Sequence, residues 1–224
     1  MDPITHFLDL TEDWRYYIRR DGLIRALPLL GGEFARLSFN HLSYLLVMRS
    51  LEDPLPNVPP SIACEIRPFT EADLAVVSAM TRPSEAKLFA RRLAKGHIGL
   101  LALHAGRPLG YAWGTAKLDL EVEKIPLHLE PGDVLCSDMY TMPEYRGKGV
   151  QTALTLARLQ LFRTLGYRRA ICYIAVGNSP SLHVWQGKIG CRTVGQIDFL
   201  RVGCWSRVRL YGSTEFHLMG ASKA

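Results

Sequence analysis

The 224-residue sequence lacks any apolar run of the roughly 18 residues that a helix needs to cross a bilayer. It also lacks the basic and then apolar start of a signal peptide, because Asp2 and Pro3 follow the first residue. We therefore expect a soluble, cytoplasmic protein with no membrane partner.

Cysteine is scarce and has no pattern of its own. The chain has five cysteines, an odd number, with no Cys-x-x-Cys and no histidine spacing that fits a metal site. The sequence therefore predicts neither a disulfide framework nor a metal cofactor. Three of them lie in apolar, strand-like runs, so buried thiols are favoured over the alternative of catalytic or metal-binding ones. The five are Cys64, Cys136, Cys172, Cys191 and Cys204.

Internal repeats and low-complexity tracts are also absent. A 48% share of hydrophobic residues is enough for a full core in a chain of this length. The formal charge of +6 and the pI near 9.2 favour polyanionic ligands. Coenzyme A, nucleic acid and acidic carrier proteins all fit this charge, which does not choose among them.

The sequence lacks the two common phosphate loops, Gly-x-x-x-x-Gly-Lys-Ser/Thr and Gly-x-Gly-x-x-Gly. Instead, an apolar run over Val134–Met142 predicts a buried strand, Gly147 and Gly149 predict a tight turn, and a helical pattern follows. The free N–H groups of a helix's first turn favour an anion, and Arg146 and Lys148 add cationic donors beside them. This stretch is a predicted phosphate site; an ordinary strand-to-helix connection is the alternative.

The same stretch resembles the acyl-CoA loop of the GNAT N-acetyltransferase superfamily. That motif reads Arg/Gln-x-x-Gly-x-Gly/Ala after a strand ending Asp/Glu-x-Tyr/Phe-Val/Thr-x-Pro. Gln151 stands where the motif has Gly or Ala. A second family signature, Asn-x-x-Ala/Ser-x-x-x-Tyr, is met in part, with Trp185 in the tyrosine place. The matching residues are Asp138, Tyr140, Thr141, Pro143, Arg146 and Gly149 in the first motif, and Asn178 and Ser181 in the second.

The resemblance implies a mixed α+β fold over residues 62–212, with a mostly antiparallel sheet of about seven strands flanked by helices. It implies acetyl-CoA or another acyl-CoA as co-substrate. The residues that it assigns to CoA binding are Met139, Thr141, Arg146, Gly147, Lys148, Gly149, Val150, Gln151, Thr152, Asn178 and Ser181.

The proline-rich stretch 51–61 divides the chain. We predict an N-terminal extension over 1–50, a linker over 51–61 and a GNAT domain over 62–224. In the extension, the patterns predict a helix over Thr11–Leu27 and a strand over Leu42–Met48. In the domain, they predict strands at Ala63–Pro68, His97–Leu103, Arg107–Ala116, Leu118–Glu123, Ala170–Val176, Cys191–Val202 and Trp205–Tyr211, and helices from Thr70, Pro83, Gly149 and Asn178.

Acyl transfer to an amine needs a base, because an alkylammonium has a pKa of roughly 10 and is charged at neutral pH. Asp138, in an otherwise apolar strand, is the predicted base, directly or through water, and Glu144 ranks second. A structural ion pair of Asp138 with a neighbouring cation is the alternative. Trp185 cannot protonate the leaving thiolate, so either the thiolate leaves unaided or Tyr140, Tyr173 or His183 substitutes. A backbone N–H near Met139–Thr141 would meet the oxyanion.

The predicted function is N-acyltransfer, by direct attack, from a CoA thioester to the amine of a small molecule. One alternative keeps the fold but takes the acyl group from a carrier protein or an aminoacyl-tRNA, which the basic charge and Gln151 would fit. Another is a non-catalytic module that binds CoA or a partner; Trp185 supports it and Asp138 argues against it. The acceptor and a homodimer both stay open.

Overall fold

The computed structural model describes most of the chain from residue 39 onward and a few positions before it. The described residues are 12–13, 15, 18–19, 39–78, 81, 83–119, 125–203, 205–213 and 215–219. Most of the predicted helix Thr11–Leu27 lies outside them, although its described positions are helical. Cys204 and most of the predicted strand Leu118–Glu123 also lie outside them, while Leu118 and Asp119 have no regular structure.

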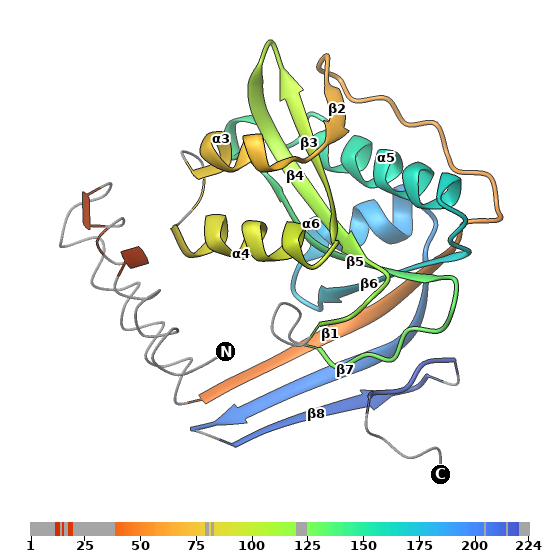
Figure 1. The fold of residues 1–224 in the computed structure, drawn as a ribbon. Coiled ribbons are helices and arrows are strands. Elements are labelled where there is room, and N and C mark those ends of the chain that lie inside the picture. Colours follow the sequence, from red (N-terminus) through yellow and green to blue (C-terminus); the bar gives the residue numbers. More distant parts are fainter. Residues whose placement is uncertain are drawn as a thin grey trace.

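Eight strands form one sheet, with helices on its faces (Figure 1). The elements are β1 (Phe39–Ser50), β2 (Glu65–Pro68), η1 (Glu71–Asp73), α3 (Leu74–Ser78), α4 (Pro83–Ala94), β3 (Ile98–His104), β4 (Arg107–Thr115), β5 (Asp133–Thr141), η2 (Pro143–Tyr145), α5 (Val150–Thr164), β6 (Arg169–Ala175), α6 (Ser179–Leu182), η3 (His183–Lys188), β7 (Arg192–Val202) and β8 (Trp205–Tyr211).

The predicted mixed α+β class is confirmed. The sheet order is β2-β3-β4-β5-β6-β1-β7-β8, and every neighbouring pair is antiparallel except β5 and β6, which α5 connects as a crossover. Seven of these strands lie in the stretch 62–212 for which the resemblance implied about seven. Among the described residues, no helix has both the length and the apolar character that a membrane span requires.

The eighth strand, β1, comes from the N-terminal extension and lies inside the sheet. It pairs with β6 from Tyr44 to Ser50 and with β7 from Phe39 to Met48. Its central residues Leu46 and Val47 are fully buried. The chain then leaves the sheet through residues 51–64, which have no helix or strand, and re-enters at the β2 edge. The domain boundaries at 50 and 61 stay a prediction.

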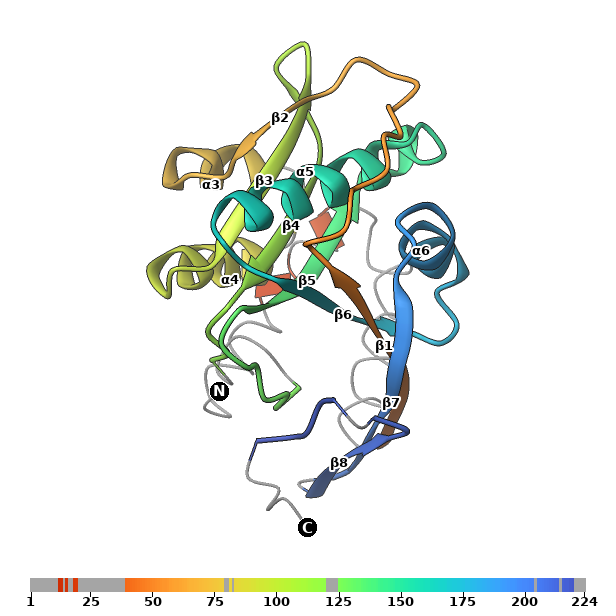
Figure 2. The same ribbon diagram turned by 90° about the vertical axis from the view of Figure 1, so that its right-hand side faces the viewer.

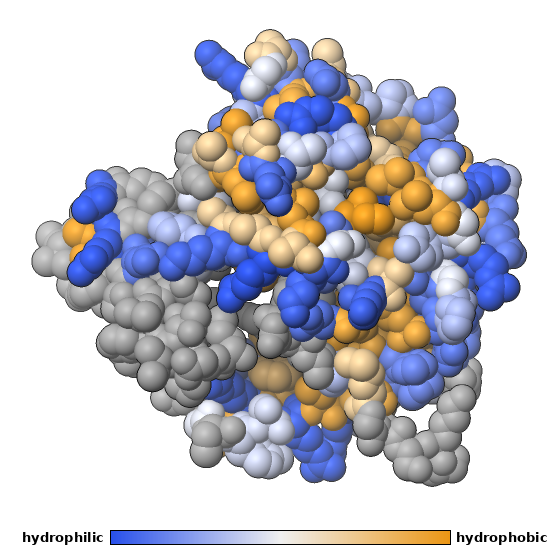
Figure 3. Space-filling view, viewed as in Figure 1, coloured by the Kyte–Doolittle hydropathy of each residue, from blue (hydrophilic) through white to orange (hydrophobic). Residues whose placement is uncertain are grey.

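The alternation of side chains along β3 and β4 separates two cores. Tyr111 and Trp113, two residues apart, face α3 and α4, and Ala112 between them faces α5. Figure 2 shows α4 and α5 on opposite sides of these strands. On the surface viewed in Figure 1, hydrophobic residues gather in the middle and hydrophilic residues surround them (Figure 3).

Candidate active site

Asp138 occupies a β-bulge in β5. Ser137 pairs with Trp113 on β4 and Met139 pairs with the adjacent Ala112, so Asp138 is an extra residue without an opposite partner. A bulge of this kind bends its strand and redirects the side chain of the extra residue. The carboxylate is consequently accessible, with 33% of the side chain exposed, although β5 is buried up to Ser137.

On its other side, β5 separates from β6. Their parallel pairing covers only Asp133–Leu135 against Arg169–Ile171, whereas β6 continues alongside β1 as far as Ala175. The two strands therefore diverge just before the bulge. On the side of β6, backbone groups of β5 from Cys136 onward face this opening rather than a neighbouring strand. The predicted oxyanion donor, near Met139–Thr141, belongs to this part of β5.

Asp138 forms an ion pair with Arg92 of α4. Arg92 Nη1 donates to Asp138 Oδ2 at 2.6 Å, and the arginine side chain is only 4% exposed. Its guanidinium also lies 5.6 Å from the ring centroid of Trp113, in cation–π range. The ion pair holds one carboxylate oxygen in place, and no hydrogen bond to the other, Oδ1, is present among the described residues.

Aromatic rings line the strand beside this carboxylate. Tyr111 stacks on Tyr140 with centroids 5.8 Å apart, and Phe89 meets Tyr111 edge-on at 4.7 Å. Burial raises the pKa of Tyr111 far above its usual range, and the charge of Asp138 adds to the effect. Tyr111 therefore stays neutral and lines the site with its ring, and it does not act as a proton donor.

A second buried arginine supports the bulge from the α5 side. Arg158 Nη1 donates to the carbonyl oxygens of Trp113 at 2.5 Å and Ser137 at 2.9 Å, the residue pair next to Asp138. Its side chain lies 5.5 Å from the Trp185 ring and is 1% exposed. The sequence analysis missed Arg92 and Arg158. The signal that could have found them is an arginine among the apolar positions of α4 and of α5, because a cation on a buried helix face needs a partner.

The predicted glycine turn has the expected backbone. Gly147 and Gly149 have φ of +77° and +80°, and Gly149 is the N-cap of α5. The bond from Ala153 N–H to Gly149 O is the first of that helix, so the N–H groups of residues 150–152 precede the helical ladder. Of the predicted binding residues, Val150 and Thr152 have buried side chains and offer only these backbone groups.

Exposed cations surround the turn. Arg146 donates to Thr141 O at 3.3 Å and lies 5.9 Å from the Tyr140 ring, and Lys148 lies 5.2 Å from the Tyr145 ring. Both side chains are solvent-accessible, as is Glu144. A Cβ on Gly147 would meet no atom within 4 Å, so the loop is open there. Free N–H groups and two accessible cations fit a pyrophosphate.

The two signature regions meet between α5 and α6. Asn178 caps α6 by accepting from Ser181 N–H at 3.2 Å, and Gln151 Nε2 donates to Ser181 Oγ at 3.4 Å. Gln151, the departure from the first motif, is therefore used as a link to the second one.

The candidate acids differ sharply in their surroundings. Trp185 is 1% exposed within the α5 core, Tyr173 packs edge-on against Tyr44 at 5.5 Å, and His183 is exposed on η3. Tyr140 lies on β5, two residues from Asp138. The predicted catalytic pair Asp138 and Tyr140 therefore shares one strand.

The described cysteines are mostly buried. Cys136, Cys172 and Cys191 are 8% exposed or less, and Cys64 is half-buried. Burial raises the pKa of Cys191 to about 12, which keeps its thiol protonated. This agrees with the predicted packing role for the three strand-like cysteines.

The chain is similar to one family of known proteins in sequence and to solved structures in fold. The profile of the Acetyltransferase (GNAT) family matches residues 65–190, more than half of the chain. No curated protein matches the sequence significantly.

Two similar solved structures share the fold at low identity. A Drosophila protein superposes with a TM-score of 0.53 at 15% identity, covering 81% of this chain and 58% of its own. A putative GNAT acetyltransferase from Novosphingobium aromaticivorans gives 0.51 at 16% identity, covering 71% of this chain and 63% of its own. The chain thus spans about three fifths of the length of each.

Proposed function

Since this chain belongs to the acetyltransferase (GNAT) family, we propose that it moves an acetyl group from a CoA thioester to the amine of a small molecule. The observation that carries the proposal is the bulge at Asp138. It exposes a carboxylate beside the point where β5 leaves β6. A thioester held in that opening would lie between a base and unpaired backbone groups.

The donor is held through its phosphates. The N–H groups of residues 150–152 and the side chains of Arg146 and Lys148 bind the pyrophosphate at the α5 N-terminus, where the helix dipole also favours negative charge. Gln151 and Ser181 support this end of α5 from the α6 side.

Asp138 acts on the acceptor. Its Oδ2 is fixed by Arg92, and Oδ1 takes a proton from the substrate ammonium, directly or through water. The neutral nitrogen then attacks the thioester carbonyl carbon, the carbon–sulfur bond breaks, and the thiolate leaves. A backbone N–H near Met139–Thr141 stabilises the negative oxygen. The nitrogen releases its second proton to solvent, and Tyr140, two residues from Asp138 on β5, protonates the thiolate and regains a proton from solvent.

The charges around the aromatic wall favour a cationic acceptor. After burial, the charges of Asp138 and Glu85 raise the pKa of Tyr111 and that of Arg92 lowers it, so two carboxylates and one guanidinium act on this hydroxyl. An ammonium group is attracted to such a place by the charges and by the aromatic faces. This supports an amine that is charged in solution.

Calorimetric titration with acetyl-CoA tests the donor site. Wild-type protein is expected to bind with micromolar affinity, and Arg146→Glu to lose most of that binding. Arg163→Glu is the matched control, because it reverses an exposed charge at the far end of α5. Loss of binding in both variants would indicate a general charge effect and count against the loop.

Turnover tests the acceptor site. Release of CoA thiol is measured over a panel of small cationic amines with wild type and Asp138→Asn. Acetyl-CoA binding with no turnover on any amine would contradict the enzyme and favour a binding module.

A further inference from the structure

Two segments far apart in the chain pair beside the sheet. Leu127 and Leu218 form an antiparallel bridge, and His128 N–H donates to His217 O at 2.9 Å. The Met219 N–H donates to Pro126 O at 2.6 Å. The end of the described chain is therefore held against the strand-like stretch 126–130.

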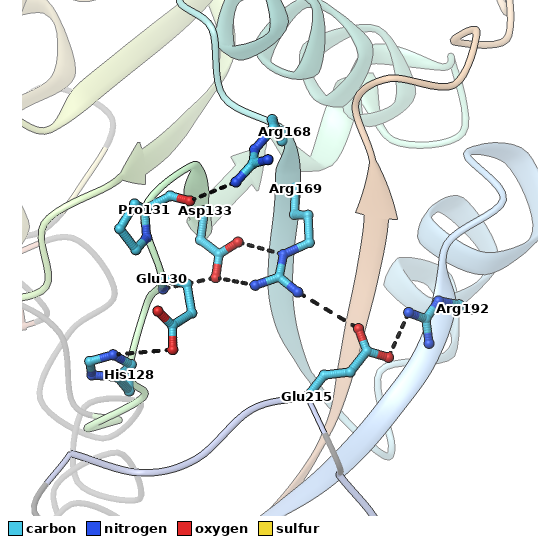
Figure 4. A network of polar contacts seen from close by, with 8 residues as sticks. All are labelled: His128, Glu130, Pro131, Asp133, Arg168, Arg169, Arg192 and Glu215. Carbon is cyan, nitrogen blue, oxygen red and sulfur yellow. Dashed lines mark hydrogen bonds and ion pairs between the residues drawn. The ribbon is translucent and has the colours of Figure 1, made fainter.

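This pairing brings three side chains with metal-ligating atoms together. The imidazole rings of His128 and His217 stack with centroids 4.4 Å apart and planes inclined by 22°. Glu130 lies two residues after His128, so both project to the same side of an extended segment. Its Oε1 is 3.6 Å from His128 Nε2, and Figure 4 shows the two side chains directed at each other. One ligand atom from each of the three residues lies within 4.8 Å of the others.

We propose that His128, Glu130 and His217 form a binding site for a divalent first-row transition metal, with zinc as the test ion. Two imidazole nitrogens and a carboxylate oxygen are a known zinc ligand set, with metal–ligand distances of about 2.0–2.2 Å that place tetrahedral ligand atoms about 3.3 Å apart. The three side chains are only half-buried, and binding requires the stacked rings to rotate so that one nitrogen of each points at the ion.

The surrounding charges leave Glu130 available to a cation. A neighbouring guanidinium, that of Arg169, is bound by Asp133 through two hydrogen bonds of 2.6 and 2.9 Å. Arg169 also contacts Glu215 at 3.8 Å, and Glu215 in turn bonds Arg192 at 2.6 Å (Figure 4). Asp133 and Glu215 therefore bind Arg169 and Arg192, while Arg168 donates to the Pro131 carbonyl oxygen.

A metal here would hold the segments 126–130 and 215–219 together. Leu127 and Phe216, the residues next to the two histidines, are buried in the same core cluster on the sheet. The ligands come from segments that are close only in the folded chain, so the ion binds the native state and stabilises it.

The test uses protein whose affinity tag has been removed and which has been dialysed against a chelator. Zn²⁺ titration is expected to show one bound ion per chain. A hundredfold excess over the dissociation constant should raise Tm by about 5–11 °C. Co²⁺ is expected to give the visible absorption bands of a tetrahedral site.

Three variants locate the ion. His128→Ala and His217→Ala are each expected to lower zinc affinity at least tenfold and to abolish the Tm shift. Glu130→Gln should weaken binding while leaving the metal-free Tm unchanged, since its side chain is 44% exposed. If a histidine variant fails to fold, Glu130→Gln decides the question. His41→Ala, at an exposed histidine of β1, is the control and should bind as wild type.

Hydrogen exchange gives a readout that does not depend on variants. Zn²⁺ is expected to slow exchange over 126–130 and 215–219 and to leave α5 unchanged. Zinc binding that persists in all three variants, or a Tm that does not respond to the ion, would overturn the proposal.

Discussion

Arg92 and Asp138, 46 positions apart, form a 2.6 Å ion pair that joins α4 to the bulge of β5. The cation is the buried member, and the carboxylate is a third exposed. The pair therefore has two roles: Asp138 compensates a charge inside the protein, and Arg92 orients a carboxylate at its surface. The ion pair that was the structural alternative is present, and the role of Asp138 as the base stays a prediction.

Asp138→Asn separates these roles, because asparagine keeps an oxygen acceptor for Arg92 but cannot take a proton. We expect kcat to fall about 10²- to 10⁴-fold with the acetyl-CoA dissociation constant unchanged. Steady-state kinetics and calorimetry measure the two quantities. Glu144→Gln, at an exposed residue beyond the strand, should stay near wild type. Wild-type turnover in Asp138→Asn would eliminate Asp138 as the base.

Gly149→Ala is expected to abolish acetyl-CoA binding. Gly149 has φ of +80°, and a Cβ there would lie 3.0 Å from the Cα of Pro60, which crosses the turn. Gly166→Ala is matched in backbone strain, with φ of +87° and no atom within 4 Å of the added Cβ. Each change costs about 1–2 kcal/mol of stability, but Gly166 follows the far end of α5. Titration should therefore show lost binding in the first variant alone; equal binding in the two would refute the assignment.

Trp185→Tyr tests whether the family tyrosine can be restored at its usual place. Trp185 is 1% exposed and packs beneath Arg158, so a phenol there has no access to the leaving thiolate. We expect an unchanged kcat and a loss of about 1–3 kcal/mol from the buried hydroxyl. Tyr140→Phe should instead lower kcat by about tenfold or more. Steady-state kinetics measures kcat in both variants, and urea denaturation measures the stability of Trp185→Tyr. A faster Trp185→Tyr enzyme would show that position 185 does reach the thiolate.

Acid should destabilise the protein in two steps. Burial lowers the pKa of His97 from its usual 6.5 to about 4, aided by the charge of Arg92. Between these values the unfolded chain takes up a proton that the native state does not, so the free energy of unfolding falls by up to about 1.4 kcal/mol per pH unit as pH drops. Below about 4 the second step begins, because hydrogen bonds from Arg67 lower the pKa of Asp73 and protonation removes that stabilisation.

Urea denaturation at several pH values between 7 and 3 resolves the two steps. His97→Gln should flatten the upper one and leave the lower one. An unchanged profile in that variant would exclude His97 as the group responsible.

The linear sequence determined much of the fold. Every strand predicted between 62 and 117, and between 134 and 212, is present with ends shifted by two residues or fewer. The glycine turn also formed as predicted, and helical structure follows Thr70 as predicted. These features rest on residues within a turn or a strand of one another, so local spacing specifies them.

Only the tertiary structure decided which distant residues meet. The apolar run 42–48 predicted a strand but not its place between β6 and β7, because an apolar run does not specify which strands it pairs with. Arg92 reaches Asp138 through the packing of α4 on the sheet, and His217 reaches His128 through a bridge outside the named strands. The sequence by itself determined the elements and the family resemblance, while side-chain pairing across the folded sheet decided how Asp138 is held and where a metal could bind.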